Sequence, residues 1–284
     1  APAPDLGPWP WEPDIRKGPR QKSLGPFRIR GFGAHRPQAW SLRSGSSSNN
    51  LRWKGGSLEW VDVQGPLIVA IDGGSGSGKS STARSLAGKL HCLHVDTGTH
   101  YRAVTHLLQE KKIPYTDVEE IEKTLAKWTL DAQVHSTHSV IRVNRAKVDD
   151  IYLRSAMVNA EVSQYSAVAP VRKFLLEFQR GQAEFALAND FRGVVMEGRD
   201  IGLNIFPQTP FKYFLFADQK VKMARRARQG ITDVIEMRDK IDSTQGQLKK
   251  APGAIDVDTT HTTLDEVVEW IYADVTVKMA GMAK

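Results

Sequence analysis

One glycine-rich stretch, GGSGSGKSS from Gly73 to Ser81, constrains the fold of this chain more than any other feature. It follows the apolar run 67–71 after a single aspartate, and apolar residues at helical spacing follow it from Ala83 to Leu90. A strand, a glycine loop and a helix in this order bring backbone N–H groups and the positive end of the helix to one anion. The stretch therefore predicts an α/β chain with a phosphate-binding loop.

Each residue type in this loop has a chemical reason. Glycine lets the backbone turn through conformations that a side chain would forbid. The pattern predicts that Lys79 reaches the β and γ phosphates of a nucleotide, and that the Ser80 hydroxyl completes the shell of a Mg²⁺ ion. The expected phosphate-binding residues are Gly73, Gly74, Ser75, Gly76, Ser77, Gly78, Lys79, Ser80 and Ser81.

Composition limits the remaining choices. A chain of 284 residues with 40% apolar content has room for one large domain or two small ones. Its single cysteine, Cys92, excludes an intramolecular disulfide and a metal site built from several cysteines. No apolar run has the length of a membrane-spanning helix, so we expect a soluble, cytoplasmic protein without a membrane partner. We also expect a monomer.

Residues 1–60 differ in composition from the rest. They hold eight of the fourteen prolines and a net charge of +6 out of +7 for the whole chain. Such a composition predicts a disordered basic tail, because it cannot bury enough apolar surface to offset chain entropy. Five of the seven tryptophans lie here. Three roles stay open for residues 1–60: nucleic-acid binding, a remnant of an organelle-targeting segment over 28–54, and an extension without a role. The last is the common case for a solvated basic tail.

From Leu67 onward, short apolar runs alternate with amphipathic segments. This alternation predicts a central parallel sheet with helices on both faces, a three-layer α/β sandwich. The expected strands are 67–71, 91–95, 193–197, 211–216 and 254–257, and the expected helices are 80–90, 99–110, 170–188, 218–229 and 263–279. The alternation breaks over about 112–165, where we expect an inserted subdomain with a strand at 140–143 in a small separate sheet.

Polar clusters follow two of the expected strands directly. Residues 96–102, DTGTHYR, follow the strand 91–95, and residues 197–200, EGRD, follow the strand 193–197. Two more clusters occur at Arg154 with Ser155 and at 238–242. A single arginine is more often a surface ion-pair partner than a ligand contact. Collected where parallel strands end, these arginines indicate a second anion site that faces the first.

These residues carry a resemblance. From about Leu67 to the C-terminus the chain resembles the bacterial-type cytidylate kinases, P-loop nucleoside monophosphate kinases that phosphorylate CMP and dCMP. The matching stretches are IDGGSGSGKSS, VDTGTHYR, VRKFLLEFQR, EGRDIGLNIFP, RDKIDST and AIDVDTT. GRDIG after a strand together with RDxxDS is far more specific than the loop alone. The resemblance implies a kinase domain over 61–284, with a monophosphate-binding insert at about 112–165 and a short lid at about 222–240.

The resemblance also implies roles. The loop holds ATP with Mg²⁺ at Ser80, Arg102 and Arg199 grip the monophosphate of CMP or dCMP, and Arg154 and Asp200 face the cytosine. The lid that closes over ATP includes Arg225. The residues implied to be catalytic are Lys79, Arg102, Arg199 and Arg225. Those implied to bind the acceptor are Thr97, Tyr101, Arg102, Arg154, Arg199, Asp200, Arg238 and Asp242.

Two departures from the family's pattern bear on the acceptor. Gln245 stands where the family usually has a further arginine, and residues 147–150 offer no match for a serine that the family places near the cytosine. The preference among CMP, dCMP and UMP therefore stays open at this point.

Two other classes of protein share the phosphate loop. A nucleotide-binding switch protein or GTPase would have no use for paired arginine clusters, and the Asn-Lys-x-Asp signature of guanine binding is absent from the sequence. A P-loop kinase of UMP, AMP or a shikimate-like substrate is the stronger alternative.

Overall fold

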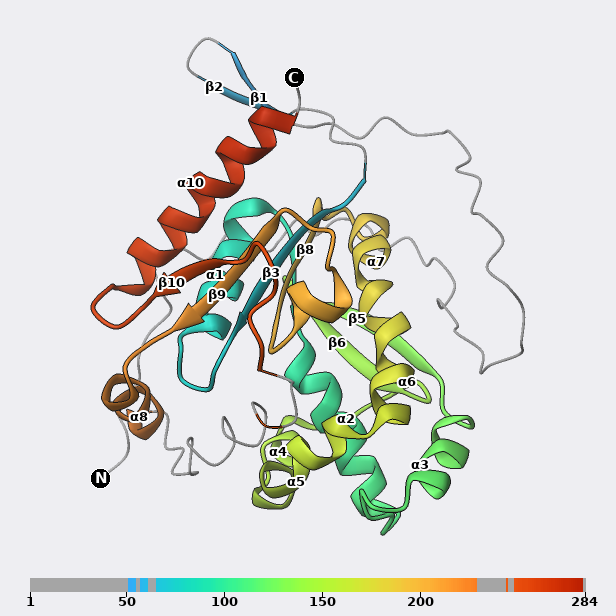
Figure 1. Cartoon of the computed structure of the whole chain (residues 1–284). Helices are drawn as coiled ribbons and strands as arrows, with labels where there is room; N and C mark the ends of the chain where they lie inside the picture. Colours follow the sequence, from blue (N-terminus) through green and yellow to red (C-terminus); the bar gives the residue numbers. More distant parts are fainter. Residues whose placement is uncertain (1–50, 55–56, 61–64, 229–243, 245–247, 283–284) are drawn as a thin grey trace, which may run out of the picture.

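The structure of the 284-residue chain is a computed structural model that describes residues 51–54, 57–60, 65–228, 244 and 248–282. A single large sheet runs through the body, in the strand order β10-β9-β3-β8-β4-β6-β5 (Figure 1). Its first five strands pair in parallel, so the predicted parallel sheet is confirmed. They are β10 (Ile255–Asp258), β9 (Phe211–Phe216), β3 (Leu67–Gly73), β8 (Gly193–Gly198) and β4 (Leu93–Asp96).

Strand β3 lies at the centre of these five. It pairs with β9 through Val69 and Phe211, and with β8 through Val69 and Val195. Val69, Ala70 and Ile71 are fully buried. A strand covered on both faces needs a continuous apolar run, which is why 67–71 shows no polar alternation.

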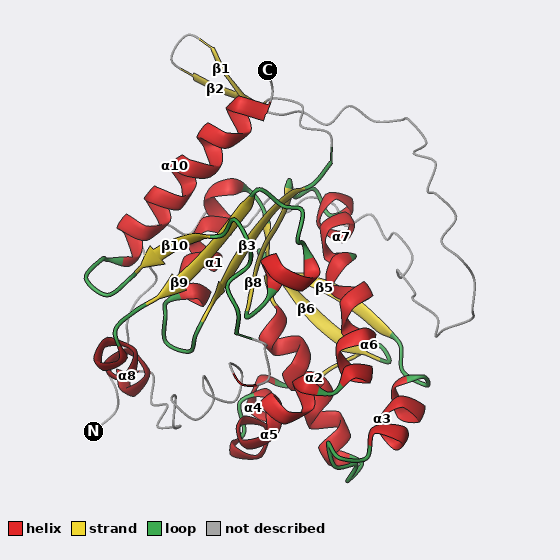
Figure 2. Ribbon diagram, in the orientation of Figure 1, coloured by secondary structure: helices red, strands yellow, loops and turns green. Residues whose placement is uncertain are grey.

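Helices cover both faces of the sheet, as the three-layer prediction requires (Figure 2). On one face, α1 (Lys79–Leu90) and α10 (Leu264–Met282) enclose a core that includes Leu86 and Ile271. On the other face, α7 (Gln182–Ala188) and the short helix η2 (Ile201–Ile205) pack on Val194 and Met196. Each large apolar side chain buried in this way contributes about 1.5–3 kcal/mol to folding.

A second core lies beyond the β4 edge of the sheet. It is formed by α2 (Thr97–Glu110), α3 (Val118–Leu125), α5 (Ala156–Ala167) and α6 (Ala169–Arg180), with β5 (Leu130–His135) and β6 (His138–Val143). Strand β7 (Ala146–Lys147) pairs with β6, and α4 (Asp150–Leu153) precedes α5. Of these elements, α3, β5, β6, β7 and α4 lie within the predicted insert of about 112–165 and α5 extends two residues beyond it, whereas α2 precedes the insert and α6 follows it.

The prediction of a small separate sheet in the insert is wrong. Strand β6 begins at His138, two residues before the expected strand 140–143, and His138 pairs in parallel with His94 of β4. The backbone N–H of His94 donates to the carbonyl of Thr137 at 2.9 Å. The strands of the insert thus continue the main sheet, and the antiparallel β5–β6 pair forms its edge.

The expected helix 170–188 is divided in two. Helix α6 ends at Arg180 and α7 begins at Gln182, with Gly181 between them. Glycine costs about 1 kcal/mol relative to alanine within a helix, so it is a natural point for the division. A capping box begins α10, because Thr263 N donates to Glu266 Oε2 at 2.8 Å and Glu266 N donates to Thr263 Oγ at 3.3 Å.

Two predicted segments, the N-terminal tail 1–60 and the lid at about 222–240, lie partly outside the described residues. Within the expected tail, β1 (Leu51–Lys54) and β2 (Ser57–Trp60) form an antiparallel hairpin, whereas 1–50 lie outside the described residues. The hairpin differs from the disorder expected for all of 1–60. Its cause is visible in the sequence, since two alternating runs flank a Gly-Gly pair suited to a two-residue turn. Of the expected lid, only the part in α8 (Gln219–Arg228) is described.

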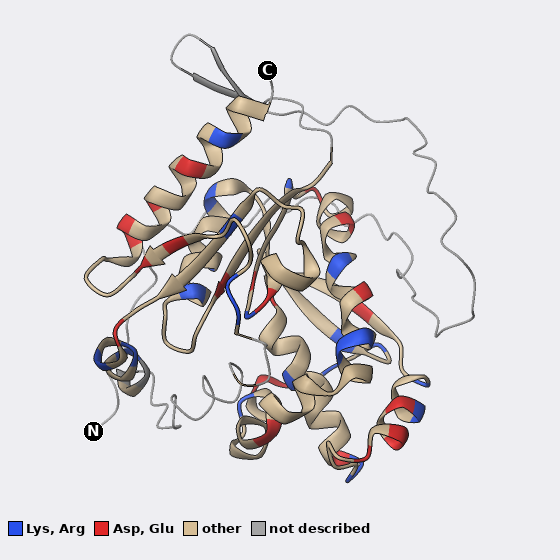
Figure 3. Ribbon diagram, in the orientation of Figure 1, with Lys and Arg blue, Asp and Glu red and all other residues tan. Residues whose placement is uncertain are grey.

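Acidic and basic residues are interspersed on the helices around the sheet (Figure 3). This agrees with the sequence, which places most of the net positive charge in residues 1–60. In the described part of the chain, the helices are all too short or too polar to cross a membrane.

Candidate active site

The loop between β3 and α1 uses glycine where the backbone leaves no alternative. Gly73 has a φ of 154°, and a Cβ on it would lie 2.2 Å from the carbonyl oxygen of Leu215 on β9. Gly78, at the N-cap of α1, has a φ of 88°. Both conformations are costly for residues with side chains. The loop therefore folds tightly against β9 and directs the N-terminus of α1 into the space at the strand ends.

Two side chains at the start of α1 are held close to this loop. The Nζ of Lys79 donates to the carbonyl of Gly74 at 3.2 Å, and the Oγ of Ser80 donates to Glu197 Oε2 at 2.5 Å. Ser77 Oγ also donates to Gly74 O, at 2.9 Å. The ammonium group and the hydroxyl expected to meet phosphate and Mg²⁺ thus lie together at the positive end of α1.

Glu197, at the end of β8, is a site residue to which the sequence reasoning assigned no role. Its carboxylate is nearly fully buried and contacts Ser80 through Oε2 and His94 Nε2 through Oε1, at 2.9 Å. Its backbone carbonyl accepts from Thr97 Oγ at 2.8 Å. The available signal was the position of Glu197 as the first residue of the cluster EGRD.

Two adjoining cavities open at the carboxyl ends of the strands. The first, the insert cavity, has a volume of about 210 Å³ and extends from the ends of β4 and β8 to Leu153, Ser163 and Arg172 of the insert and α6. The second, the loop cavity, has a volume of about 460 Å³ and extends over Gly76, Gly78 and Arg84. The residues that line both are Ser75, Lys79, Ser80, Asp96, Arg102 and Arg154.

Most of the expected site residues that the structure describes line these cavities. Arg102, on α2, donates from Nη1 to Leu153 O at 2.9 Å and to Asn159 Oδ1 at 2.7 Å. Arg199 donates from Nη1 to Gly73 O at 3.2 Å and from Nη2 to Ser75 Oγ at 3.1 Å. The structure thus holds Arg199 against the phosphate loop and Arg102 against the insert, and both side chains line the insert cavity. Thr97, Tyr101, Arg154 and Asp200 also line the insert cavity.

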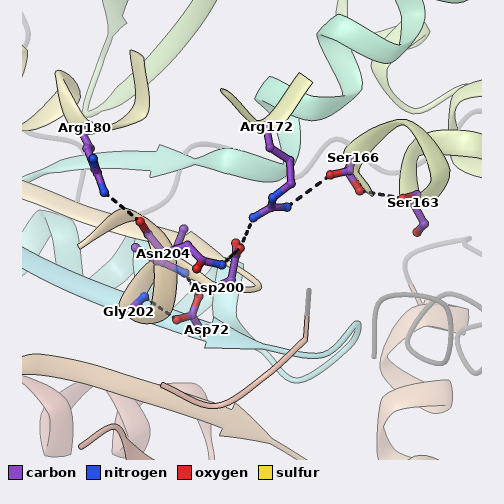
Figure 4. A network of polar contacts seen from close by, with 9 residues as sticks. Asp72, Ser163, Ser166, Arg172, Arg180, Asp200, Gly202 and Asn204 are labelled. Carbon is purple, nitrogen blue, oxygen red and sulfur yellow. Dashed lines mark hydrogen bonds and ion pairs between the residues drawn. The ribbon is translucent and has the colours of Figure 1, made fainter. Parts of the chain in front are cut away.

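A polar network surrounds Asp200 at the far end of the insert cavity (Figure 4). Asp200 is 4% exposed and forms an ion pair with Arg172 of α6, while Asn204 Nδ2 donates to Asp200 Oδ2 at 2.6 Å. Arg172 Nη1 also donates to Ser166 O at 3.3 Å, and Ser166 Oγ donates to Ser163 O at 2.9 Å. Burial lowers the pKa of Arg172, but the electrostatic interactions with Tyr101 and Asp200, together with the hydrogen bond to Asp200, outweigh burial and raise that pKa overall.

This network includes Arg172, a residue to which the resemblance gave no role. Arg172, and not Arg154, lies against Asp200, whereas Arg154 is exposed where the two cavities adjoin. Two serines, Ser163 and Ser166, line the insert cavity, and the carbonyl of Ser166 accepts a hydrogen bond from Arg172. The signal was present in the matching stretch VRKFLLEFQR, which contains Arg172.

Asp72, near the end of β3, holds the backbone directly after Asp200. It is 3% exposed and accepts from the backbone N–H of Ile201 at 2.7 Å and of Gly202 at 2.9 Å. Burial raises the pKa of Asp72 to about 6, although these two hydrogen bonds work in the opposite direction. The carboxyl group therefore fixes the start of η2, directly after Asp200.

Helix α2 presents its first turns to both cavities. Asp96 caps it by accepting from Thr99 N at 3.3 Å and from Thr99 Oγ at 2.9 Å. Burial alone would raise the pKa of Asp96, yet the Thr99 hydrogen bond and nearby positive charge lower it overall. Burial raises the pKa of Tyr101 to about 12, so the phenol stays neutral, and the Arg172 guanidinium lies 5.9 Å from its ring centroid.

The lid residues are only partly described. Arg225, on α8, donates to Thr259 Oγ at 3.0 Å and to Thr259 O at 2.6 Å. The Thr259 hydroxyl donates in turn to Ser77 O of the phosphate loop at 2.9 Å. Arg225 thus reaches the loop through one threonine. Arg238, Asp242 and Gln245 lie outside the described residues.

The donor set fits a magnesium ion. Ser80, Asp96 and Glu197 offer oxygen atoms only, the ligands that Mg²⁺ prefers, and all three line the insert cavity. Within the described ranges, the structure contains no group of three or more His, Cys, Asp or Glu side chains that could hold a metal ion. Such a sparse protein donor set suits Mg²⁺, which is usually held by few carboxylates together with phosphates and water.

A parallel α/β sheet with a phosphate loop and a second cavity containing arginines defines a P-loop kinase of a small phosphate-bearing acceptor. Residues 69–277 match the family model described as cytidylate kinase. A protein named cytidylate kinase from Fusobacterium nucleatum is 35% identical, and the match covers 72% of this chain and 95% of that protein. Another of the same name, from Cytophaga hutchinsonii, is 36% identical, and the match covers 72% of this chain and 91% of that protein. One from Clostridium tetani is 36% identical over 218 residues, covering 92% of that protein. The chain belongs to the cytidylate kinase family.

Proposed function

We propose that this protein transfers the γ-phosphoryl group of ATP to CMP, and also to dCMP, giving CDP or dCDP and ADP. The observation that carries the proposal is that the loop cavity and the insert cavity adjoin at Lys79, Ser80 and Arg102. ATP in the first and a monophosphate in the second would place their phosphates next to each other. Family membership supports CMP as the acceptor.

The phosphate loop and the N-terminus of α1 bind the ATP phosphates. Lys79 supplies a positive charge for the β and γ phosphates. Ser80, with Asp96 and Glu197 nearby, would hold Mg²⁺, which when bound neutralises charge on the phosphate oxygens. Arg225 would exchange its contact with Thr259 for ATP as the lid closes.

The chemistry needs no nucleophile from the protein. An oxygen of the CMP phosphate attacks the γ-phosphorus in line, the new P–O bond forms, and the bond to the β,γ-bridging oxygen breaks with ADP as the leaving group. The protein's part is to align the two phosphates and to stabilise charge, since correct positioning is itself worth several kcal/mol. Arg102 and Arg199 suit the acceptor phosphate, because planar guanidinium groups bind it through two donors.

Asp200 selects the base in this proposal. Its carboxylate accepts a hydrogen bond from the exocyclic amine of cytosine, whereas uracil would present an acceptor oxygen to it. Arg172 and the serine pair Ser163 and Ser166 lie beside Asp200 and complete a polar wall for the base.

Steady-state phosphorylation of CMP, dCMP, UMP and AMP, measured in parallel with ATP and Mg²⁺, tests this function. We expect the highest kcat/KM for CMP and dCMP. A higher kcat/KM for UMP or AMP, or transfer only to a shikimate-like alcohol, would replace the proposed acceptor by that substrate.

We further propose that the enzyme acts in the cytoplasm and as a monomer. The monomer is supported by the residues of one chain that line both cavities. Light scattering during gel filtration, with and without nucleotides, tests the monomer.

A further inference from the structure

A buried histidine lies behind the carboxylate that contacts Ser80. His94, on β4, is opposite Val195 of β8 in the sheet register, and Glu197 follows Val195 by two residues. Residues two apart on a strand share a face, so His94 and Glu197 are diagonal neighbours on one side of the sheet. Their side chains are 4% and 2% exposed, and His94 Nε2 lies 2.9 Å from Glu197 Oε1.

The chemistry of the pair assigns the donor. An ionised carboxylate only accepts hydrogen bonds, so the imidazole donates from Nε2. Ser80 Oγ donates to the other oxygen, Oε2. The buried carboxylate of Glu197 therefore has one donor on each oxygen, and both are needed because a buried charge without partners is costly.

We propose that His94 is a positioning residue for magnesium-dependent nucleotide binding. By donating to Oε1, it fixes the Glu197 carboxylate so that Oε2 accepts the hydrogen bond from the Ser80 hydroxyl. The lone pairs of Ser80 Oγ then face the cavity, where a cation bound to ATP needs them. This inference rests on the proposed function, in which Ser80 lies beside the metal of Mg-ATP.

The position of His94 in the sheet favours a rigid support. Its backbone N–H donates to Thr137 O, and His94 is the residue of β4 that pairs with β6 of the insert. The imidazole is thus anchored where the insert joins the main sheet. A support held by backbone contacts on both sides keeps its hydrogen bond in place when ligands bind.

The experiment measures binding and not turnover. A fluorescent ATP analogue is titrated into the full chain at a series of Mg²⁺ concentrations, and once in EDTA, for the wild type and for His94→Leu. We expect the Mg²⁺ concentration for half-maximal binding to rise about 10-fold in His94→Leu, in the range found for groups that orient metal ligands. Affinity in EDTA should stay within about twofold, because the phosphate loop is intact. Equal Mg²⁺ dependence of both proteins overturns the proposal.

Variants separate the hydrogen bond from general packing. His94→Gln places an amide donor at a reach similar to that of Nε2 and should restore most of the Mg²⁺ dependence. His94→Asn, which keeps a polar side chain but is too short to reach Glu197, should behave like His94→Leu and serves if the leucine variant does not fold. If glutamine and asparagine give the same result, the hydrogen bond is not the cause.

His100→Leu is the matched control. His100 is also buried, at 1% exposure, but it packs edge-on against Phe178, and neither of its ring nitrogens forms a hydrogen bond among the described residues. Its replacement should leave the Mg²⁺ dependence unchanged. Because binding is the readout, the role of His94 stays testable even if CMP is not the acceptor. Conversely, if His94→Leu phosphorylates CMP with normal Mg²⁺ dependence, the role of His94 is wrong and the proposed function still stands.

Discussion

The guanidinium group of Arg172 forms an ion pair with the carboxylate of Asp200, and this contact joins helix α6 to the segment between β8 and η2. Asp200 also accepts from Asn204, so a nearly buried carboxylate is oriented from two directions. Since the base of the acceptor is proposed to meet this carboxylate, its selection depends on α6 as well as on the strand end.

Replacement of Arg172 by methionine should weaken acceptor binding. We expect kcat/KM for CMP to fall about 30-fold, the equivalent of about 2 kcal/mol for a charge-assisted hydrogen bond, mainly through KM. Stability should also fall, because Asp200 keeps its burial but loses its cationic partner. Kinetics and urea unfolding measure the two effects. Lys173→Met, an exposed neighbour on the same helix, is the control, and equal kcat/KM in both variants would contradict the role of Arg172.

Asp200→Ala and Arg102→Ala should differ in kind. Without the Asp200 carboxylate, the ratio of kcat/KM for CMP to that for UMP should fall about 10-fold or more. The reason is that a hydrogen bond that distinguishes cytosine from uracil, worth about 1–3 kcal/mol, is lost. Without Arg102, kcat/KM should fall by a similar factor for every monophosphate, since the phosphate is common to all. Parallel assays on CMP, dCMP, UMP and AMP measure both. If the two variants lose the same activities in the same proportions, the division between base and phosphate contacts is wrong.

The parts of this site that the sequence predicted are those with a local cause. The phosphate loop depends on closely spaced glycines between one strand and one helix, and Arg102 and Arg199 come after strands that apolar runs predict. Arg172 is different, because it comes from the middle of a helix. Only the packing of α6 against the strand ends, a contact between residues distant in the sequence, brings it to Asp200.

The same limit applies to the fold. The centre of the parallel sheet could be predicted because β3 and β8 contain continuous apolar runs that are buried on both faces, whereas the edge strand β10 alternates apolar and acidic residues. That β6 joins β4 could not, since the join rests on a single pair, His94 with His138, between strands distant in the sequence. Glu197 was visible in the cluster EGRD, but its bond to Ser80 requires two elements to meet.

Lys79→Ala should affect turnover far more than affinity. The Lys79 ammonium lies at the loop and faces both cavities, so its charge is available to the transferred phosphoryl group. We expect kcat to fall about 100-fold or more, as for other groups that stabilise transition-state charge, with the Kd of ATP changed only a few-fold. Rapid kinetics and equilibrium binding give the two values. Lys89→Ala, at the other end of α1 where Lys89 pairs with Glu269, should change neither. Unchanged kcat in Lys79→Ala would remove the loop lysine from the mechanism.

His100 makes the fold sensitive to acid. Burial lowers the pKa of His100 to about 4 from 6.5, and neither ring nitrogen has a hydrogen-bond partner among the described residues. Between these values the unfolded chain binds a proton that the folded chain does not, so the contribution to stability is complete above pH 6.5 and is lost as pH falls toward 4. The loss amounts to about 3 kcal/mol at most, at about 1.4 kcal/mol per pKa unit.

His100→Leu should therefore flatten the pH dependence of stability on the acid side. Urea unfolding at several pH values between 7 and 4.5 should show the free energy of unfolding of the wild type falling relative to that of the variant. Asp72 acts with the opposite sign, since its pKa is raised by burial to about 6 and its contribution is lost as pH rises through that value. Asp72 is present in both proteins, so their difference isolates His100. A difference that stays constant across this pH range would show that the imidazole does not titrate as proposed.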